Sequence, residues 1–151
     1  MRIALAALAI AVAVPMMAKP NFNGEWKLNT TKSNFGEMPA PDRMSMKINH
    51  EDPKLAVHMS QAGQFGEMDW DTKYTTDGKE STNIIRDSPS TSVVKWDGDA
   101  LVFDTKGKFG DNDFTMKDKW TLSEDGKTLT MNRHFSSSFG EGDQKLVLEK
   151  Q

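Results

Sequence analysis

A pair of opposite charges, Arg133 and Asp118, is the best candidate for ligand chemistry in this sequence. If Asp125-Gly126 is the tight turn of a hairpin, the register of its two strands places Asp118 directly opposite Arg133. Both then lie on a face whose other side chains are apolar. This predicts a polar anchor inside an apolar cavity, in which Arg133 holds a carboxylate or phosphate and Asp118 orients it. The alternatives are a structural ion pair, or an Arg133 stacked on a tryptophan at the closed end of the fold.

Bulky apolar side chains occupy the same alternate positions of their strands as this pair, which predicts that they also face the interior. Methionine is flexible and polarizable, and it suits a surface that must adapt to different apolar shapes. We expect these side chains to line a cavity for a lipid-like or aromatic molecule. The other interpretation is that they fill the interior, because a small barrel is either packed solid or holds one small ligand. The predicted walls are Trp70, Trp96, Trp120, Met46, Met59, Met116, Met131 and Phe103.

Other kinds of site find little support in the sequence. There is no cysteine, which excludes disulfides, thiolate metal sites and a thiol nucleophile. The three histidines, His50, His58 and His134, lack the spacing of a metal site, and we expect no metal and no cofactor. The Met44-x-Met46 pair could bind cuprous copper, but alternation along a strand explains that spacing without a metal.

Length and charge limit the choice of fold and partner. The chain has 151 residues, which fits one domain, with 19 basic and 22 acidic side chains and a net charge of −3. Nucleic-acid binders carry a strong basic excess, so we expect no nucleic-acid partner.

The N-terminus has the pattern of a secretory signal peptide. Arg2 precedes an apolar run over Ile3–Val14, and Ala18 offers a small residue for cleavage. The run is shorter than the about 20 residues that a membrane-spanning helix needs. We therefore predict a signal peptide over residues 1–18 and a single domain over residues 19–151. Because the exported chain has no disulfide, we expect it in a bacterial periplasm or secreted into the medium.

Apolar and polar side chains alternate along the rest of the chain, which indicates half-buried antiparallel strands. We count about ten strands, joined by short hairpins except for a longer connection at residues 30–42. A meander of that length exposes two edges unless it closes. We therefore predict an all-β, soluble, antiparallel up-and-down barrel of about 8–10 strands. The hairpin dipeptides are Asp77-Gly78, Asp97-Gly98 and Asp125-Gly126.

The opposite face of the strands is charged. A barrel in a membrane would have apolar side chains outside and polar ones inside. We therefore expect an apolar interior, a solvated outer surface and no membrane insertion. The outward charges are Lys47, Asp69, Asp71, Lys73, Lys95, Lys117, Lys119 and Lys145.

The hairpin at Asp77-Gly78 has a distinctive consequence. A tight turn there would place Tyr74 opposite Ser81 and Thr72 opposite Asn83. That register brings Ser81 and Asn83 inside and predicts a small hydrogen-bonding patch in the cavity. The alternatives are a position near the open rim, or a bulge that shifts the register.

The stretch Phe22–Leu28 resembles the opening strand of the calycins, the lipocalins and fatty-acid-binding proteins, which carry a Gly-x-Trp there, met by Gly24 and Trp26. The mature chain is also similar to uncharacterised exported bacterial lipocalin-like proteins. The resemblance implies that Gly24 and Trp26 close one end of the barrel. In lipocalins an arginine late in the barrel packs over this tryptophan, and Arg133 is its counterpart here.

The sequence departs from the fatty-acid-binding proteins at two places. Their last strand has an Arg-x-Tyr that holds the ligand carboxylate, whereas this chain has Arg133-His134-Phe135 followed by another strand. Their two-helix lid has no counterpart, because residues 30–42 are too few and are interrupted by prolines.

These observations favour binding or carriage of a small hydrophobic or amphipathic molecule inside an exported barrel. The first alternative is a barrel with a solid core that acts through its surface as a partner or inhibitor of an envelope protein. A cavity of at least about 300 Å³ separates the two. We expect no enzymatic activity; the rival is a barrel hydrolase or isomerase with His50 or Asp118 as its base.

Overall fold

The computed structural model describes residues 18–64 and 66–151 of the chain. The signal peptide predicted over residues 1–18 falls, apart from Ala18, outside the described residues. Within the described part every regular element is a β-strand. That part of the chain contains no helix of the length and apolarity needed to cross a lipid bilayer.

Ten strands make up the fold, and their side chains alternate between the interior and the solvent. In the second strand, for example, Met44, Met46, Ile48 and His50 are buried and every residue between them is exposed. The strands are β1 (Gly24–Leu28), β2 (Arg43–Glu51), β3 (Lys54–Gly63), β4 (Gly66–Thr75), β5 (Asp77–Ile85), β6 (Ser88–Asp97), β7 (Ala100–Phe109), β8 (Asn112–Leu122), β9 (Thr128–Ser137) and β10 (Gly140–Lys150).

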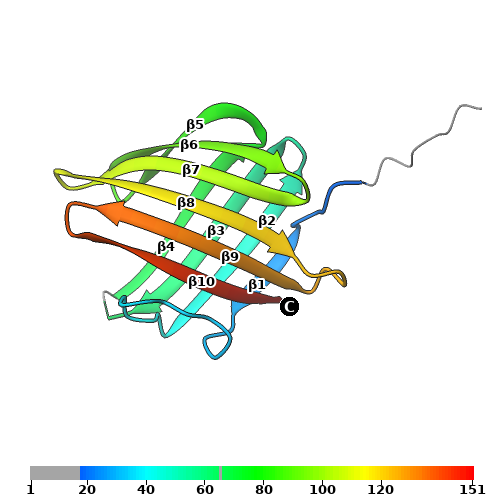
Figure 1. Cartoon of the computed structure of the whole chain (residues 1–151), viewed down its shortest axis with the longest axis horizontal. Helices are drawn as coiled ribbons and strands as arrows, with labels where there is room; N and C mark the ends of the chain where they lie inside the picture. Colours follow the sequence, from blue (N-terminus) through cyan, green and yellow to red (C-terminus); the bar gives the residue numbers. More distant parts are fainter. Residues whose placement is uncertain (1–17, 65) are drawn as a thin grey trace, which may run out of the picture.

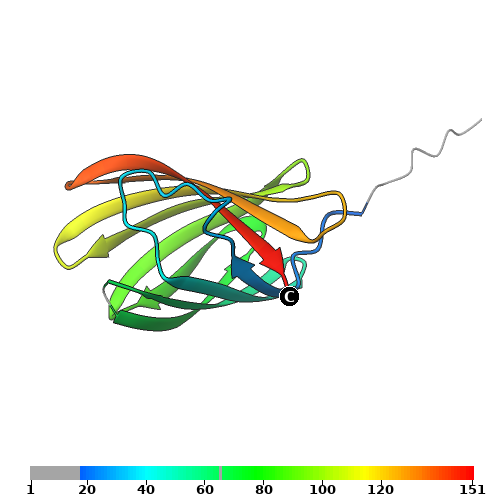
Figure 2. The ribbon, with the colours of Figure 1, turned by 90° about the horizontal axis from the view of Figure 1, so that it is seen from below.

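All ten strands belong to one antiparallel sheet, in the order β4-β3-β2-β1-β10-β9-β8-β7-β6-β5. The sheet curls on itself because β1 pairs with β10, with Trp26 opposite Lys150. Strands β5–β10 form one wall that crosses β1–β4 behind it (Figure 1), and the perpendicular view shows both walls curving around a common interior (Figure 2). The predicted antiparallel up-and-down barrel is confirmed.

The barrel lacks a backbone ladder at one junction, between β4 and β5. The register predicted from a tight turn at Asp77-Gly78 is therefore wrong. Asp77 instead begins β5 and pairs with Lys95 of β6, and a register shift follows before Glu80. Strand β5 pairs with β6 from its first residue and not with β4. The register shift between Asp77 and Glu80 corresponds to the bulge that the sequence analysis gave as an alternative.

Side chains of β5 take over the missing backbone bonds. The Asn83 amide accepts a hydrogen bond from the Lys73 backbone N–H at 2.8 Å and donates one to the Lys73 carbonyl at 3.0 Å. The Ser81 hydroxyl accepts from the Thr75 N–H at 3.2 Å. Ser81 and Asn83 thus bind the edge of β4 and do not form the predicted patch in the cavity.

The hairpin at Asp125-Gly126 has the predicted register. Trp120 lies opposite Met131 and Asp118 opposite Arg133. Gly126 has a φ of +70°, a conformation that residues with a Cβ rarely adopt. The turn therefore fixes which side chains meet inside the barrel.

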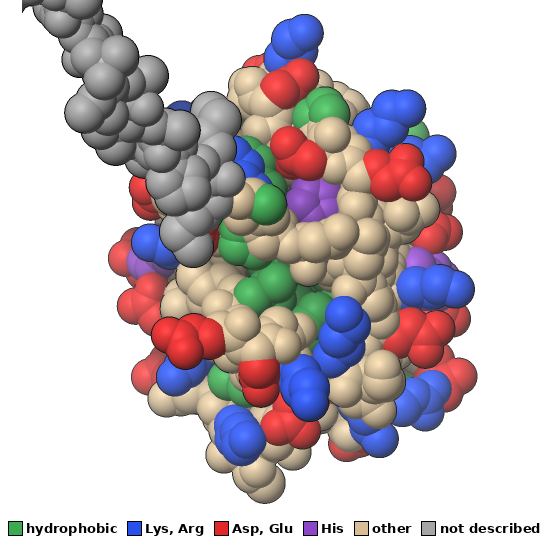
Figure 3. Space-filling view, turned by 90° about the vertical axis from the view of Figure 1, so that its right-hand side faces the viewer, with side chains coloured by type: hydrophobic (Ala, Val, Ile, Leu, Met, Phe, Trp, Pro, Cys, Tyr) green, Lys and Arg blue, Asp and Glu red, His purple; other side chains and the backbone are tan. Residues whose placement is uncertain are grey.

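One end of the barrel is closed by a packed core around Phe22 and Trp26, whose indole N–H donates to the Phe22 carbonyl at 3.0 Å. A Cβ at Gly24 would stand 2.8 Å from Cε of Lys150, so glycine allows this close approach. The ammonium of Lys150 lies 5.8 Å from the centre of the Trp26 ring. Lys150 thus has the position over Trp26 that the lipocalin resemblance implied for Arg133. Figure 3 shows that charged side chains of both signs surround this end.

The carboxylate of Asp52 ties three segments together at the closed end. It accepts hydrogen bonds from the Thr76 hydroxyl at 2.6 Å and the Trp96 indole at 3.0 Å, and it lies 3.3 Å from Nε2 of His50. The Phe22 backbone N–H donates to Nδ1 of His50 at 3.3 Å, so the ring proton is on Nε2, facing Asp52. Burial by itself raises the pKa of Asp52. The hydrogen bonds from Thr76, His50 and Trp96 outweigh that effect and lower the pKa below its ordinary value.

We expect Asp52→Ala to lower the free energy of unfolding by about 1–2 kcal/mol at neutral pH, because several donors lose their acceptor. The lowered pKa means that the contribution is present above the ordinary pKa of a carboxyl. It is lost as the pH falls through the lowered value, so the difference from the native chain should shrink in acid. Urea unfolding at a series of pH values measures this. Asp111→Ala, in an exposed turn, is the control, and equal effects of the two substitutions would contradict the assignment.

Candidate functional site

The barrel encloses a cavity of about 630 Å³. This volume lies within the range of about 300–1,000 Å³ that is typical of small-molecule sites. The interior is therefore hollow and not packed solid. Strands of both walls contribute to the lining, and its apolar part is rich in methionine. The methionines that the strands contribute to the wall are Met44, Met46, Met59, Met68, Met116 and Met131.

All but one of the predicted ligand-binding residues lie on the wall of this cavity. Trp96 is the exception, because it sits at the closed end of the barrel and donates its indole N–H to Asp52. The Trp96 side chain faces inward as predicted, but it lies nearer the closed end of the barrel than the cavity does. The predicted residues on the wall are Arg133, Asp118, Trp70, Trp120, Met46, Met59, Met116, Met131 and Phe103.

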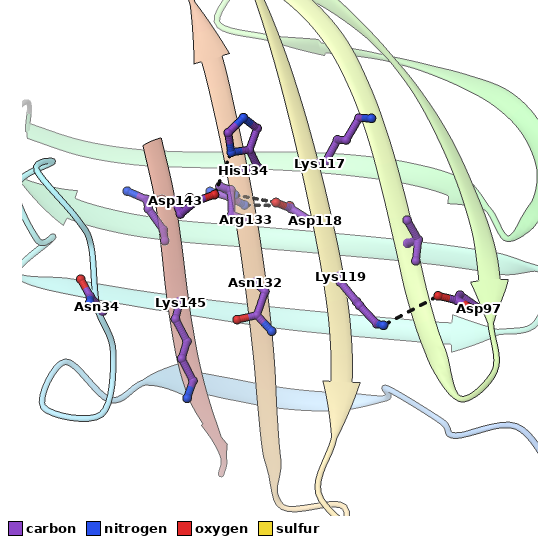
Figure 4. A pocket seen from close by; sticks show the side chains of 12 residues that line it. Asn34, Asp97, Lys117, Asp118, Lys119, Asn132, Arg133, His134, Asp143 and Lys145 are labelled. Carbon is purple, nitrogen blue, oxygen red and sulfur yellow. Dashed lines mark hydrogen bonds and ion pairs between the residues drawn. The ribbon is translucent and has the colours of Figure 1, made fainter. Parts of the chain in front are cut away.

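Arg133 and Asp118 form a two-point ion pair inside the barrel. The guanidinium donates from Nε to one carboxylate oxygen at 2.8 Å and from Nη2 to the other at 3.0 Å. Asp118 is 5% exposed, and the Arg133 side chain is 20% exposed. Figure 4 shows the two side chains reaching toward each other from β9 and β8. The fork geometry fixes the plane of the guanidinium within the cavity.

Tyr74 adds a hydroxyl to the Arg133–Asp118 pair from the opposite wall. Burial by itself lowers the pKa of Arg133, but Asp118 raises it above its ordinary value through charge and hydrogen bonding. Burial, assisted by the negative charge of Asp118, raises the pKa of Tyr74, so that its phenol stays neutral. The Tyr74 ring meets Phe103 edge-on, with ring centres 5.3 Å apart. The polar centre thus holds one positive and one negative charge and a neutral hydroxyl.

Two hydrogen-bond donors on this part of the wall are unused within the described chain. Nη1 of Arg133 takes no part in the pair with Asp118. The indole N–H of Trp120 is buried without an acceptor among the described residues. Trp120 is held against Phe103, with ring centres 4.3 Å apart. A buried donor without an acceptor is unfavourable, and a ligand oxygen can supply what is missing.

Aromatic rings of β7, β8 and β9 line one side of the cavity at its open end. Phe109 stacks on Phe114 with ring centres 4.4 Å apart, and Phe114 stacks on Phe135 at 5.9 Å. Phe109 is 55% exposed although it is apolar. Gly107 makes room for this stack, because a Cβ there would lie 2.7 Å from the Phe114 ring.

The connection between β1 and β2 borders the same opening. It is fastened to β10 by an isolated bridge between Asn34 and Lys145 and by a hydrogen bond from the Gln144 amide to the Phe35 carbonyl at 3.3 Å. Phe35 and Met38 from this connection lie on the cavity wall. Sequence reasoning missed them, since an irregular connection has no period; apolar residues among prolines were the available signal. No helix is present at this place, as predicted.

A shallow depression of about 600 Å³ lies on the outer face of β7–β10. Figure 4 shows its exposed charges, among them Lys117, Lys119 and Lys145. Lys119 pairs with Asp97 at 3.7 Å, so charges of both signs already meet here, and His134 contacts Asp143 at 2.7 Å. No group of three potential metal ligands occurs among residues 18–64 and 66–151. The interior cavity is therefore the better candidate site.

The fold is shared with solved structures of the calycin group, which confirms the predicted resemblance at the level of the fold. The zebrafish ileal bile acid-binding protein with cholic acid gives a TM-score of 0.59 at 16% identity, covering 86% of this chain and 98% of that one. A mutant of the fluorescent protein UnaG gives 0.58 at 19% identity, covering 86% and 96%. The fatty-acid-binding protein of Manduca sexta gives 0.54 at 16% identity, covering 85% and 99%. No protein-family model and no curated protein matches the sequence.

We expect Arg133→Ala to lower the free energy of unfolding by about 3–5 kcal/mol, because it leaves the buried Asp118 carboxylate without its partner. The double variant Arg133→Met/Asp118→Leu should recover most of that loss, since no unpaired charge remains. Denaturant titration measures both.

The matched control is another Arg–carboxylate pair, Arg43 and Glu67, whose side chains are 60% and 73% exposed. Arg43→Ala should change the free energy of unfolding by less than about 1 kcal/mol. If Arg133→Ala were as mild as Arg43→Ala, the buried pair would not have the assigned importance.

Proposed function

We propose that this protein binds or carries a small hydrophobic or amphipathic molecule inside its barrel. The observation on which the proposal rests is the cavity of about 630 Å³, with an apolar wall and a polar centre formed by Arg133 and Asp118. Predominantly apolar concavities with a few placed polar groups are the usual form of small-molecule sites.

Apolar burial is the main source of affinity in this proposal. A ligand that buries about 200 Å² of apolar surface would gain about 5 kcal/mol before the costs of association. The flexible methionines let the wall fit ligands of different outline. The polar centre then sets the orientation of the ligand and its selectivity.

The structures that share the fold support ligand binding as a class of function. Two of the three named above are described as a bile acid-binding and a fatty-acid-binding protein. Their ligands are not transferred to this chain, because the identity is 16% in both cases. We also propose a binding role in preference to catalysis, since His50 lies at the closed end and Asp118 is paired with Arg133.

We further propose that the chain is exported, on the pattern of its first 18 residues, and acts in a bacterial periplasm or medium. An envelope protein as a partner stays a prediction. Native mass spectrometry of the protein purified from its own host tests both the role and the place. We expect the mature chain to begin near Lys19 and to carry a small molecule of lipid size.

A neutral fluorescent probe tests the cavity directly. We expect N-phenyl-1-naphthylamine to gain fluorescence on binding, and Met116→Trp to weaken that binding by about ten-fold because the larger side chain occupies the cavity. Thr115→Trp is the matched control, since the neighbouring residue faces outward and is exposed. Binding that is equally sensitive to both substitutions, or absent in the native protein, would contradict an internal site.

A further inference from the structure

The polar centre of the cavity is electrically compensated. Both oxygens of Asp118 accept from Arg133, and the Nε and Nη2 atoms of Arg133 are engaged in return. The edge of the guanidinium that is best suited to grip a carboxylate is therefore already filled by a carboxylate of the chain itself. No other Lys or Arg is paired with Asp118 within the described residues.

An anionic ligand head would meet this compensated pair at a disadvantage. A second carboxylate beside Arg133 would stand close to Asp118, and like charges repel strongly where water is scarce. The anion would also lose its own hydration without gaining an unshared cation. The fixed charges of the centre thus favour a head group without charge.

The hydrogen-bond donors that are unused on the wall indicate which polar group the ligand should have. Nη1 of Arg133 and the Trp120 indole are both donors, and the Tyr74 hydroxyl can donate as well. Trp120 and Asp118 are two residues apart on the inward face of β8, so Trp120 lies beside the ion pair on one wall, and Tyr74 adds its hydroxyl from β4 on the opposite wall. Their complement is an oxygen that accepts hydrogen bonds.

Building on the proposed function, we propose that the cavity selects an uncharged amphipath whose polar end has an acceptor oxygen, such as a long-chain alcohol or ester, over the carboxylate of the same chain. Arg133 acts as a donor already matched by Asp118, and not as a counter-ion for the ligand. Trp120 supplies the second donor.

Competition against N-phenyl-1-naphthylamine tests this with 1-dodecanol, methyl dodecanoate and dodecanoate at a pH above the pKa of the free acid. We expect the alcohol and the ester to displace the probe at concentrations about ten-fold lower than the acid. Equal or tighter displacement by dodecanoate would overturn the inference while leaving the proposed function intact. Displacement by none of the three, with no binding of the probe, would overturn both.

A simple preference of an apolar cavity for less hydrated ligands would give the same ranking, so a variant separates the two causes. Asp118→Asn removes the compensating charge and should tighten dodecanoate by about ten-fold while changing 1-dodecanol by less than about three-fold. The control Asp104→Asn makes the same change of charge on the outward face of β7 and should alter neither. An unchanged affinity of Asp118→Asn for dodecanoate would contradict the role of compensation.

Trp120→Phe provides a readout that needs no change of charge. It should weaken 1-dodecanol by about three- to ten-fold, because the alcohol loses a donor. The control is Trp70→Phe, which shortens another ring on the cavity wall. Equal effects of the two variants on 1-dodecanol would exclude a specific donor at Trp120.

Discussion

The ion pair between Arg133 and Asp118 is the interaction on which the site depends. Neither charge is stable alone inside an apolar barrel, because the free energy of removing it from water has to be offset by a partner. The partner is available only when β8 and β9 are in one register, because a slip of either strand by one residue would turn its charge to the outer face and leave the other charge unpaired inside. Fold and site thus depend on the same pairing, which the turn at Asp125-Gly126 establishes.

The sequence was informative where a short turn determines the geometry. Alternation gave the strands, and Asp125-Gly126 gave the opposition of Asp118 and Arg133. The same reasoning failed at Asp77-Gly78, because β5 pairs with β6 and not with β4. Which neighbour a strand chooses depends on the closure of the whole barrel, and a dipeptide contains no information about that.

Parity along a strand also leaves one coordinate undetermined. It tells whether a side chain faces inward but not how far along the barrel axis it lies, and Trp96 shows the difference, since it faces inward yet sits below the cavity. Neither turn dipeptides nor alternation along a strand could predict the position of the connection between β1 and β2. Phe35 and Met38 border the opening through irregular backbone that is anchored to β10 by long-range contacts. These contacts have no local pattern that a single sequence reveals.

The junction of β4 and β5 makes the barrel mechanically uneven. Elsewhere around the sheet a ladder of backbone bonds resists separation of the strands, and each rung holds its neighbours in place. At this junction the side chains of Asn83 and Ser81 hold the two edges together, and a side chain can rotate away without any strand being displaced. The girth of the barrel can therefore change along this single seam while the other junctions keep their registers. A rigid ion pair and an expandable wall can coexist in one small molecule because they lie on different strands.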